Sequence, residues 1–302
     1  MTGELAALAA ALTFGLSTVT ARRFMDAVTP EAGALVSIVM NVATFWTLAA
    51  VVMLRNGAPP LPAGALILFI VGGLAGTLVG RNLSYLSIER IGPSLLVTIR
   101  LTQTMFTLLF GLVFLAELPR PWQLGGLASV ALGLWISLRS RETSGPGEVR
   151  RRDAPAMRRV DIAALLIAFA SGAAFSLGDT ARRAALVIVP APILGAAIGA
   201  SAALVAHLVW SITRRSARWP SGPALQSVDL WTSAFFNTLA ILFLYTALRS
   251  SPVAIVSTLY NLQILVVLVG SRVLLRGRET VGGGLVVGSG LALAGTAMIL
   301  LG

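Results

Sequence analysis

The chain has 302 residues, of which 56% are hydrophobic and only 12% are charged, and its mean hydropathy is +0.87. Soluble domains carry about a quarter charged residues, so this composition excludes an ordinary soluble protein and indicates a protein embedded in lipid. All 23 basic residues are arginines, the formal net charge is +11, and the absence of cysteine excludes disulfides and thiolate metal sites.

Ten apolar segments long enough to cross a bilayer follow one another along the chain. Proline and glycine signals separate them, as at Thr29-Pro30, Gly92-Pro93 and Pro252. We predict spanning helices over residues 4–22, 31–54, 64–87, 92–115, 121–138, 161–182, 191–213, 228–248, 252–275 and 280–301.

The two halves of the chain repeat one another at an offset of about 160 residues. The tripeptide Ala-Arg-Arg stands at 21–23 and at 181–183, and the offset also pairs Tyr85 with Tyr245 and Gln103 with Gln263. A unit of five spans repeated in tandem must place its second copy upside down in the bilayer. The predicted fold is therefore an all-α polytopic membrane protein with ten transmembrane helices in two inverted five-helix repeats. These repeats cover residues 1–138 and 161–302, and the arginine-rich linker 139–160 joins them.

The arginines favour one side of this topology, namely the turns after spans 1, 3, 5, 7 and 9. The positive-inside rule then places the linker in the cytoplasm and both termini outside, in a multi-pass protein of the cell inner (plasma) membrane. Because the arginines lie at membrane edges, their expected partner is the lipid bilayer and not nucleic acid. Glycines recur every fourth residue in several spans, which favours helix packing within a monomer over a homodimer interface.

The fourth and ninth spans carry the candidate substrate site. Arg100 lies a few residues from the centre of the fourth span, and Gln103 and Thr104 follow on the same helical face. A charge there costs about 2.5–3.5 kcal/mol, so Arg100 must face a partner or water. A guanidinium group suits a substrate carboxylate or phosphate, although a purely structural arginine is the alternative. Tyr260, Asn261 and Gln263 occupy the middle of the ninth span, with Tyr260 at the offset of 160 from Arg100.

Other ionisable residues are expected to be structural. Arg81 is predicted to extend towards the membrane interface, and Asp179 to pair with Arg182 and Arg183 near a membrane edge. The sequence thus shows no carboxylate at mid-membrane, which favours facilitated diffusion or exchange. There is no Walker loop and no nucleophile elbow, so we expect neither an enzyme nor a cofactor, and no metal site.

In its layout the chain resembles the drug/metabolite transporter superfamily, and more narrowly the EamA-type permeases. The resemblance rests on ten spans in two related halves, an arginine ending span 1 and Pro93 opening span 4. The stretch from Gly111 through Phe114-Leu115-Ala116-Glu117 and a glycine-rich span with Gly125, Gly126 and Gly133 complete it. The second half lacks a clean counterpart of Glu117, and the first span lacks the glutamate that couples protons in the small multidrug relatives.

The resemblance implies export or exchange of small polar metabolites, such as amino acids, by alternating access. We expect substrate binding between the repeats, by Arg100, Gln103, Thr104, Tyr260, Asn261 and Gln263. A multidrug or cationic-solute exporter is one alternative, and a membrane scaffold or sensor subunit without transport is another. Either a monomer or a homodimer fits the sequence.

Overall fold

The computed structural model describes residues 3–115, 121–143, 162–213, 222–275 and 282–301, and these residues form helices without any strand. The first half comprises α1 (Gly3–Phe24), α2 (Pro30–Asn56), α3 (Ala63–Gly72), the π-helix η1 (Gly73–Gly80), α4 (Arg81–Ile91), α5 (Pro93–Arg100), α6 (Gln103–Leu115) and α7 (Pro121–Thr143). The second half comprises α8 (Ile162–Ile188), α9 (Pro192–Thr213), α10 (Gly222–Leu225), α11 (Val228–Ser250), α12 (Val253–Asn261), α13 (Gln263–Leu274) and α14 (Gly283–Leu301).

Eight helical segments of the described chain are long and apolar enough to cross a membrane, and α14 is a shorter apolar helix. This confirms an all-helical, multi-pass membrane protein. Apolar side chains cover much of its outside, with Leu54 88% exposed and Val228 78% exposed. A soluble monomer rarely presents such a surface, whereas lipid tails cover it without cost.

Three of the predicted spans are interrupted in the structure. The segment 64–87 continues through the glycine-rich π-helix η1, while 92–115 breaks between α5 and α6 and 252–275 breaks between α12 and α13. At Leu101 and Leu262 the backbone N–H bonds to the carbonyl three residues earlier, at 3.2 and 3.1 Å, so each helix tightens locally. Both breaks directly precede a glutamine, Gln103 in α6 and Gln263 in α13.

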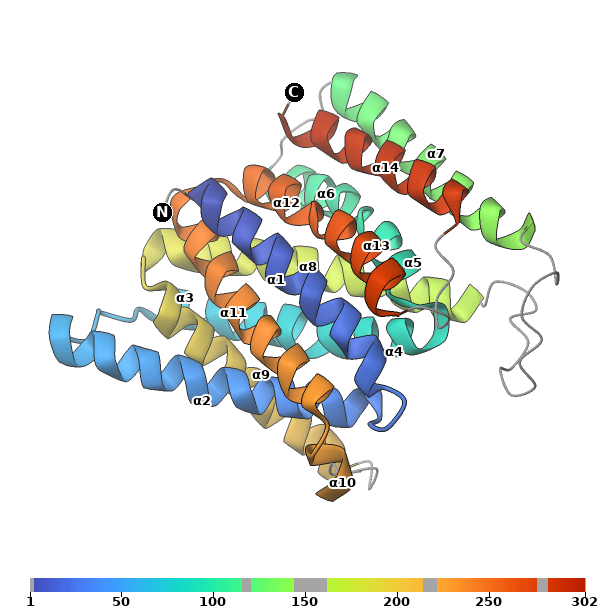
Figure 1. The fold of residues 1–302 in the computed structure, drawn as a ribbon. Helices are drawn as coiled ribbons and strands as arrows, with labels where there is room; N and C mark the ends of the chain where they lie inside the picture. Colours follow the sequence, from blue (N-terminus) through green and yellow to red (C-terminus); the bar gives the residue numbers. More distant parts are fainter. Residues whose placement is uncertain (1–2, 116–120, 144–161, 214–221, 276–281, 302) are drawn as a thin grey trace.

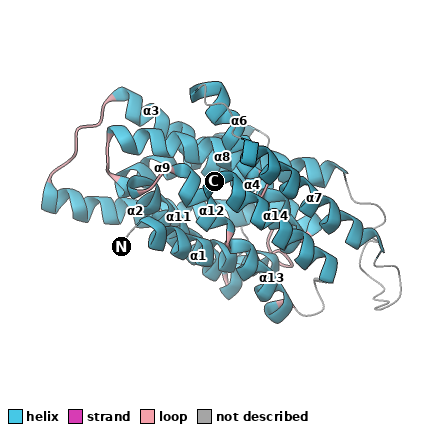
Figure 2. Cartoon of the chain, turned by 90° about the horizontal axis from the view of Figure 1, so that it is seen from above, coloured by secondary structure: helices cyan, strands magenta, loops and turns pink. Residues whose placement is uncertain are grey.

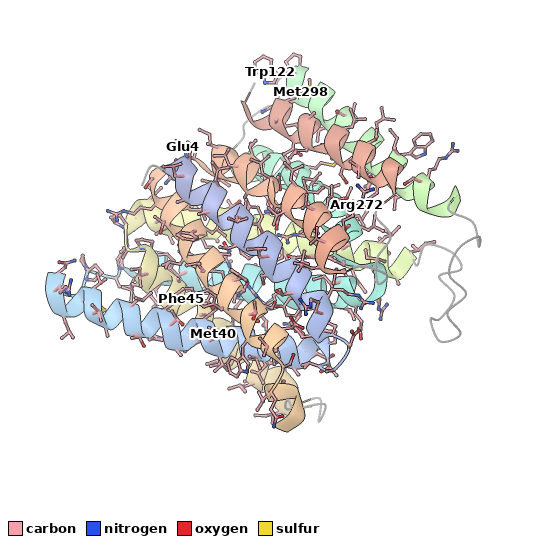
Figure 3. All side chains as sticks on the ribbon, viewed as in Figure 1. Glu4, Met40, Phe45, Trp122, Arg272 and Met298 are labelled. Atoms are coloured by element: carbon pink, nitrogen blue, oxygen red, sulfur yellow. The ribbon has the colours of Figure 1, made fainter. Side chains whose placement is uncertain are left out.

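The helices pack by close approach of small residues. In both views α7 and α14 lie side by side at one edge of the bundle (Figures 1 and 2), and Trp122 and Met298 mark the same end of this pair (Figure 3). At their crossing, a Cβ atom on Gly133 would meet the backbone of Gly288, so no larger residue fits without a shift. The predicted role of the glycine stripes in packing within the monomer is confirmed at this pair.

Glycines also allow close packing in the centre of the bundle. A Cβ on Gly73 would collide with the carbonyl of Gly199, which brings η1 against α9. A Cβ on Gly76 would meet the guanidinium of Arg182, at 2.5 Å from its Nη2. The glycines of η1 therefore make room both for a neighbouring backbone and for a buried charged side chain.

Candidate functional site

The centre of the site is a hydrogen bond between two of the predicted residues. Arg100, the last residue of α5, donates from Nη2 to the hydroxyl of Tyr260 on α12 at 2.7 Å. The ring of Phe175 on α8 lies 4.2 Å from the guanidinium carbon of Arg100, and the ring of Phe14 on α1 packs edge-on against Tyr260, with centroids 5.0 Å apart. An aromatic side chain from the first helix of each half thus covers one member of the pair.

The polar stripe of the fourth span divides between two neighbours. Thr104 accepts a hydrogen bond from the Asn261 amide at 3.3 Å, so it faces the ninth span as Arg100 does. Gln103 instead turns to α8, where its amide donates to a carboxylate oxygen of Asp179 at 3.3 Å. Gln263 is 3% exposed, and its Oε1 has no hydrogen-bond partner among the described residues.

Arg182 joins this site to the π-helix. Its Nη1 pairs with Asp179 at 2.8 Å, and its Nη2 donates to the carbonyl of Gly72 and to the hydroxyl of Thr77, both at 3.0 Å. Because the backbone registers of α3 and η1 change at Gly72, its carbonyl remains available to an outside donor. The buried guanidinium, 1% exposed, therefore ties α8 to the glycine-rich segment Gly73–Gly80.

Arg81 is a further charged residue whose side chain lies inside the helix bundle. It is 4% exposed, and its guanidinium lies 6.0 Å from the ring centroid of Tyr85, one turn along α4. Its guanidinium interacts most strongly with Tyr85 and more weakly with Tyr260 and Arg182, while its Nε has no hydrogen-bond partner among the described residues. The predicted extension of this arginine to the membrane interface is wrong, because its helix continues for ten residues beyond it to Ile91 and holds it inside the bundle.

The predicted edge position of Asp179 is also wrong. Its pairing with Arg182 is confirmed, but Arg183 donates to two backbone carbonyls at the end of α11 instead. The reason is length, because α8 runs from Ile162 to Ile188 whereas the sequence predicted 161–182. Asp179 consequently lies more than two turns inside the helix end and contacts Gln103, so a carboxylate does stand at the polar centre.

Of the predicted substrate residues, Arg100 contacts Tyr260 and Thr104 contacts Asn261 across the fourth and ninth spans. Gln103 instead contacts Asp179 on α8, and Gln263 begins the half-helix that follows Asn261. Glu117 lies outside the described residues. In the described segments no three histidine, aspartate or glutamate side chains come together as metal ligands. The site offers guanidinium groups, amides, hydroxyls and the Asp179 carboxylate, which can bind and orient polar solutes.

Comparison with known proteins agrees with this arrangement. Residues 1–139 match the sequence profile of the EamA-like transporter family. This part of the chain is similar to EamA-type transporters. The match confirms the resemblance to the drug/metabolite transporter superfamily and, with the apolar helices, supports a membrane transporter of that kind.

A protein of known crystal structure shares the fold over nearly the whole chain, with a TM-score of 0.65. The two are 19% identical, and the similarity covers 99% of this chain and 96% of the other, which relates their folds alone. No curated protein matches the chain.

Proposed function

We propose that the protein is a secondary transporter that moves small polar metabolites with an anionic group, such as amino acids, by alternating access. The observation that carries the proposal is the polar centre itself, where Arg100 is 4% exposed and, among the described residues, hydrogen-bonds to the hydroxyl of Tyr260 alone. A charged group in the bilayer that has no carboxylate in direct contact is costly, which makes it a candidate for binding a substrate. In this proposal Arg100 binds the anionic group, and Gln103, Gln263, Thr104 and Asn261 orient polar atoms.

We further propose that ten spans form two inverted repeats, 1–138 and 161–302, joined by the linker 139–160. The way the helices pair supports this proposal, because each main contact between a span of one half and a span of the other has a counterpart in which the two halves change roles. The first span of each half packs on the third span of the other, as α1 on α11 and α8 on α3, η1 and α4. The second, fourth and fifth spans meet their own counterparts, as α2 with α9, α5 with α13 and α7 with α14.

The proposed motion uses the interrupted helices. The half-helices α5 and α6, and likewise α12 and α13, meet beside Arg100 and Tyr260. Transporters of this type place substrates at such breaks and rock one repeat against the other around them. We propose further that the protein exports or exchanges its substrate across the cell inner membrane, with the linker 139–160 in the cytoplasm. A monomer is sufficient for this transport because one chain supplies both halves.

A cationic-drug exporter fits the site less well. Asp179 is the carboxylate that such a substrate would need, yet Arg182 neutralises it at 2.8 Å. The neighbouring Arg100 and Arg81 would repel a cation. A scaffold or sensor subunit has no use for buried guanidinium groups with unsatisfied donors, which argues against the reading without transport.

Counterflow in proteoliposomes tests the function. Vesicles holding the purified protein are preloaded with pooled amino acids and organic acids, and uptake of labelled pool members is compared for wild type, Arg100→Gln and Arg55→Gln. Arg55 is exposed at the end of α2, so it is the matched control for loss of an arginine. Uptake that fails only in Arg100→Gln is the expected result. Equal uptake by all three proteins would show that Arg100 has a structural role and does not bind the substrate. No uptake by any of them would contradict the proposed transport function.

A further inference from the structure

The buried charges of the described chain do not cancel. The buried charged side chains are Arg81, Arg100, Arg182 and Asp179, so three guanidinium groups accompany one carboxylate. Arginine cannot lose its proton in a protein, so burial does not remove these charges. A site built in this way remains electrostatically unsatisfied until a ligand brings negative charge to it.

Arg182 already has its counter-charge. Its two terminal nitrogens are used by Asp179, by the carbonyl of Gly72 and by the hydroxyl of Thr77. The carboxylate of Asp179 also accepts from the Gln103 amide. Asp179 thus compensates the charge of Arg182, although Arg182 Nε and Gln103 Oε1 have no hydrogen-bond partner among the described residues, and the positive charge without a carboxylate in direct contact belongs to Arg81 and Arg100.

Arg81 and Arg100 share the features of ligand-binding arginines. Each is 4% exposed and has an Nε without a hydrogen-bond partner. The ring of Phe175 lies between their helices: its centroid is 4.2 Å from the guanidinium carbon of Arg100, and its ring atoms lie 3.0 Å from where a Cβ on Gly80, the residue before Arg81, would stand. Two guanidinium groups on one polar centre are arranged to receive two anionic groups of a single small molecule, each through charge-assisted hydrogen bonds.

We propose, building on the transport function above, that the substrate carries two anionic groups, one bound by Arg100 and the other by Arg81. The unpartnered Oε1 atoms of Gln103 and Gln263 are acceptors, so the substrate also has a hydroxyl or ammonium donor. Acidic amino acids, hydroxylated dicarboxylates and phosphate monoesters share this chemistry. A zwitterion with a neutral side chain supplies only one anionic group and leaves Arg81 unpaired.

The substrate pair glutamate and glutamine tests the inference without any mutation, because the two differ mainly in one charge. In wild-type counterflow we expect glutamate, malate or glycerol phosphate to be exchanged at least tenfold better than glutamine, a ratio that corresponds to about 1.4 kcal/mol. Whichever of these three solutes is exchanged shows whether the second anionic group is a carboxylate or a phosphate. Exchange of glutamine or alanine at the rate of the best dianion would overturn the inference while the transport function stood. If no solute moved, the transport function itself would fail.

Variants then test whether Arg81 is the residue that binds the second anionic group of the substrate. Arg81→Gln is expected to remove the preference for the dianionic solute, whereas Arg81→Lys retains part of it and the exposed control Arg55→Gln retains all of it. Ligand-induced stabilisation of the detergent-purified protein gives a second readout: the dianion raises the melting temperature of wild type and loses this effect in Arg81→Gln. An undiminished preference and melting shift in a folded Arg81→Gln would overturn the inference.

Discussion

Arg100 and Tyr260 stand 160 residues apart, at the offset that also relates Tyr85 to Tyr245 and Gln103 to Gln263, and they are hydrogen-bonded to each other at 2.7 Å. Corresponding positions of the two halves therefore meet in space at the polar centre. Such a meeting is expected only where two related units face one another, so the contact links the repeat in the sequence to the location of the site.

Tyr260→Phe is expected to strengthen substrate binding, opposite in sign to Arg100→Gln. The change removes the hydroxyl that occupies Arg100 and keeps the ring that packs against Phe14. Without the tyrosine hydroxyl as a competing acceptor, the guanidinium group is free to hydrogen-bond to the substrate, which increases the binding free energy. The half-saturating substrate concentration in counterflow should therefore fall about 3- to 10-fold. Weakening as severe as in Arg100→Gln would mean instead that the hydroxyl itself holds the substrate.

Asp179→Asn and Arg182→Gln should each destabilise the protein strongly, and the double variant should cost less than the two together. Removing one member of a buried ion pair leaves the other charge unpaired, at a cost of about 3–5 kcal/mol. The double-mutant cycle, measured by denaturant unfolding in detergent, isolates the pair interaction. Additive effects would show that these side chains act independently, contrary to their 2.8 Å contact.

Gly73→Ala should lower the melting temperature because the new Cβ collides with the carbonyl of Gly199 on α9. In an unobstructed helix the same change stabilises by about 1 kcal/mol, since glycine is a poor helix former. Gly64→Ala in α3 is the matched control, because nothing lies within 4 Å of a Cβ there. A melting temperature for Gly73→Ala equal to that of this control would contradict the close approach of η1 and α9.

The proposed inverted arrangement predicts opposite labelling at two corresponding positions. The chain has no cysteine, so single cysteines at Ala27 and Val187, both exposed and 160 residues apart, are unambiguous reporters. A membrane-impermeant maleimide added to intact cells should label the cysteine at 187 and leave the cysteine at 27 unmodified until the membrane is opened. Labelling of both from one side would show that the halves run in the same direction.

Hydrophobic periodicity and stop signals were sufficient to predict where the helices lie, because lipid demands long apolar segments with internally satisfied backbones. They were insufficient for the interruptions at Leu101 and Leu262, which keep the apolar pattern while shifting from four-residue to three-residue backbone hydrogen bonds. They also failed for the end of α8, where a helix that packs inside the bundle continues past Arg182 and Arg183.

The site was predictable in part, for a related reason. Arg100 was evident as a charge in an apolar span, and Tyr260 followed from the repeat offset. Asp179 and Arg182 were missed because a charged pair at a predicted helix end is usually exposed, and only the packing of α8 buries them. Phe175 has no signal of its own, since an aromatic residue in a membrane helix is ordinary until it is found over a guanidinium group.

The contact between Arg100 and Tyr260 also limits how alike the two halves can become. Where corresponding positions touch, a chain with arginine in both would press two guanidinium groups together at hydrogen-bonding distance, and one with tyrosine in both would lose its anion-binding charge. Neither half, assembled with a second copy of itself, would reproduce this centre. Divergence between the halves is therefore a requirement of the proposed binding chemistry, and we expect a symmetrised sequence to keep the architecture while losing the site.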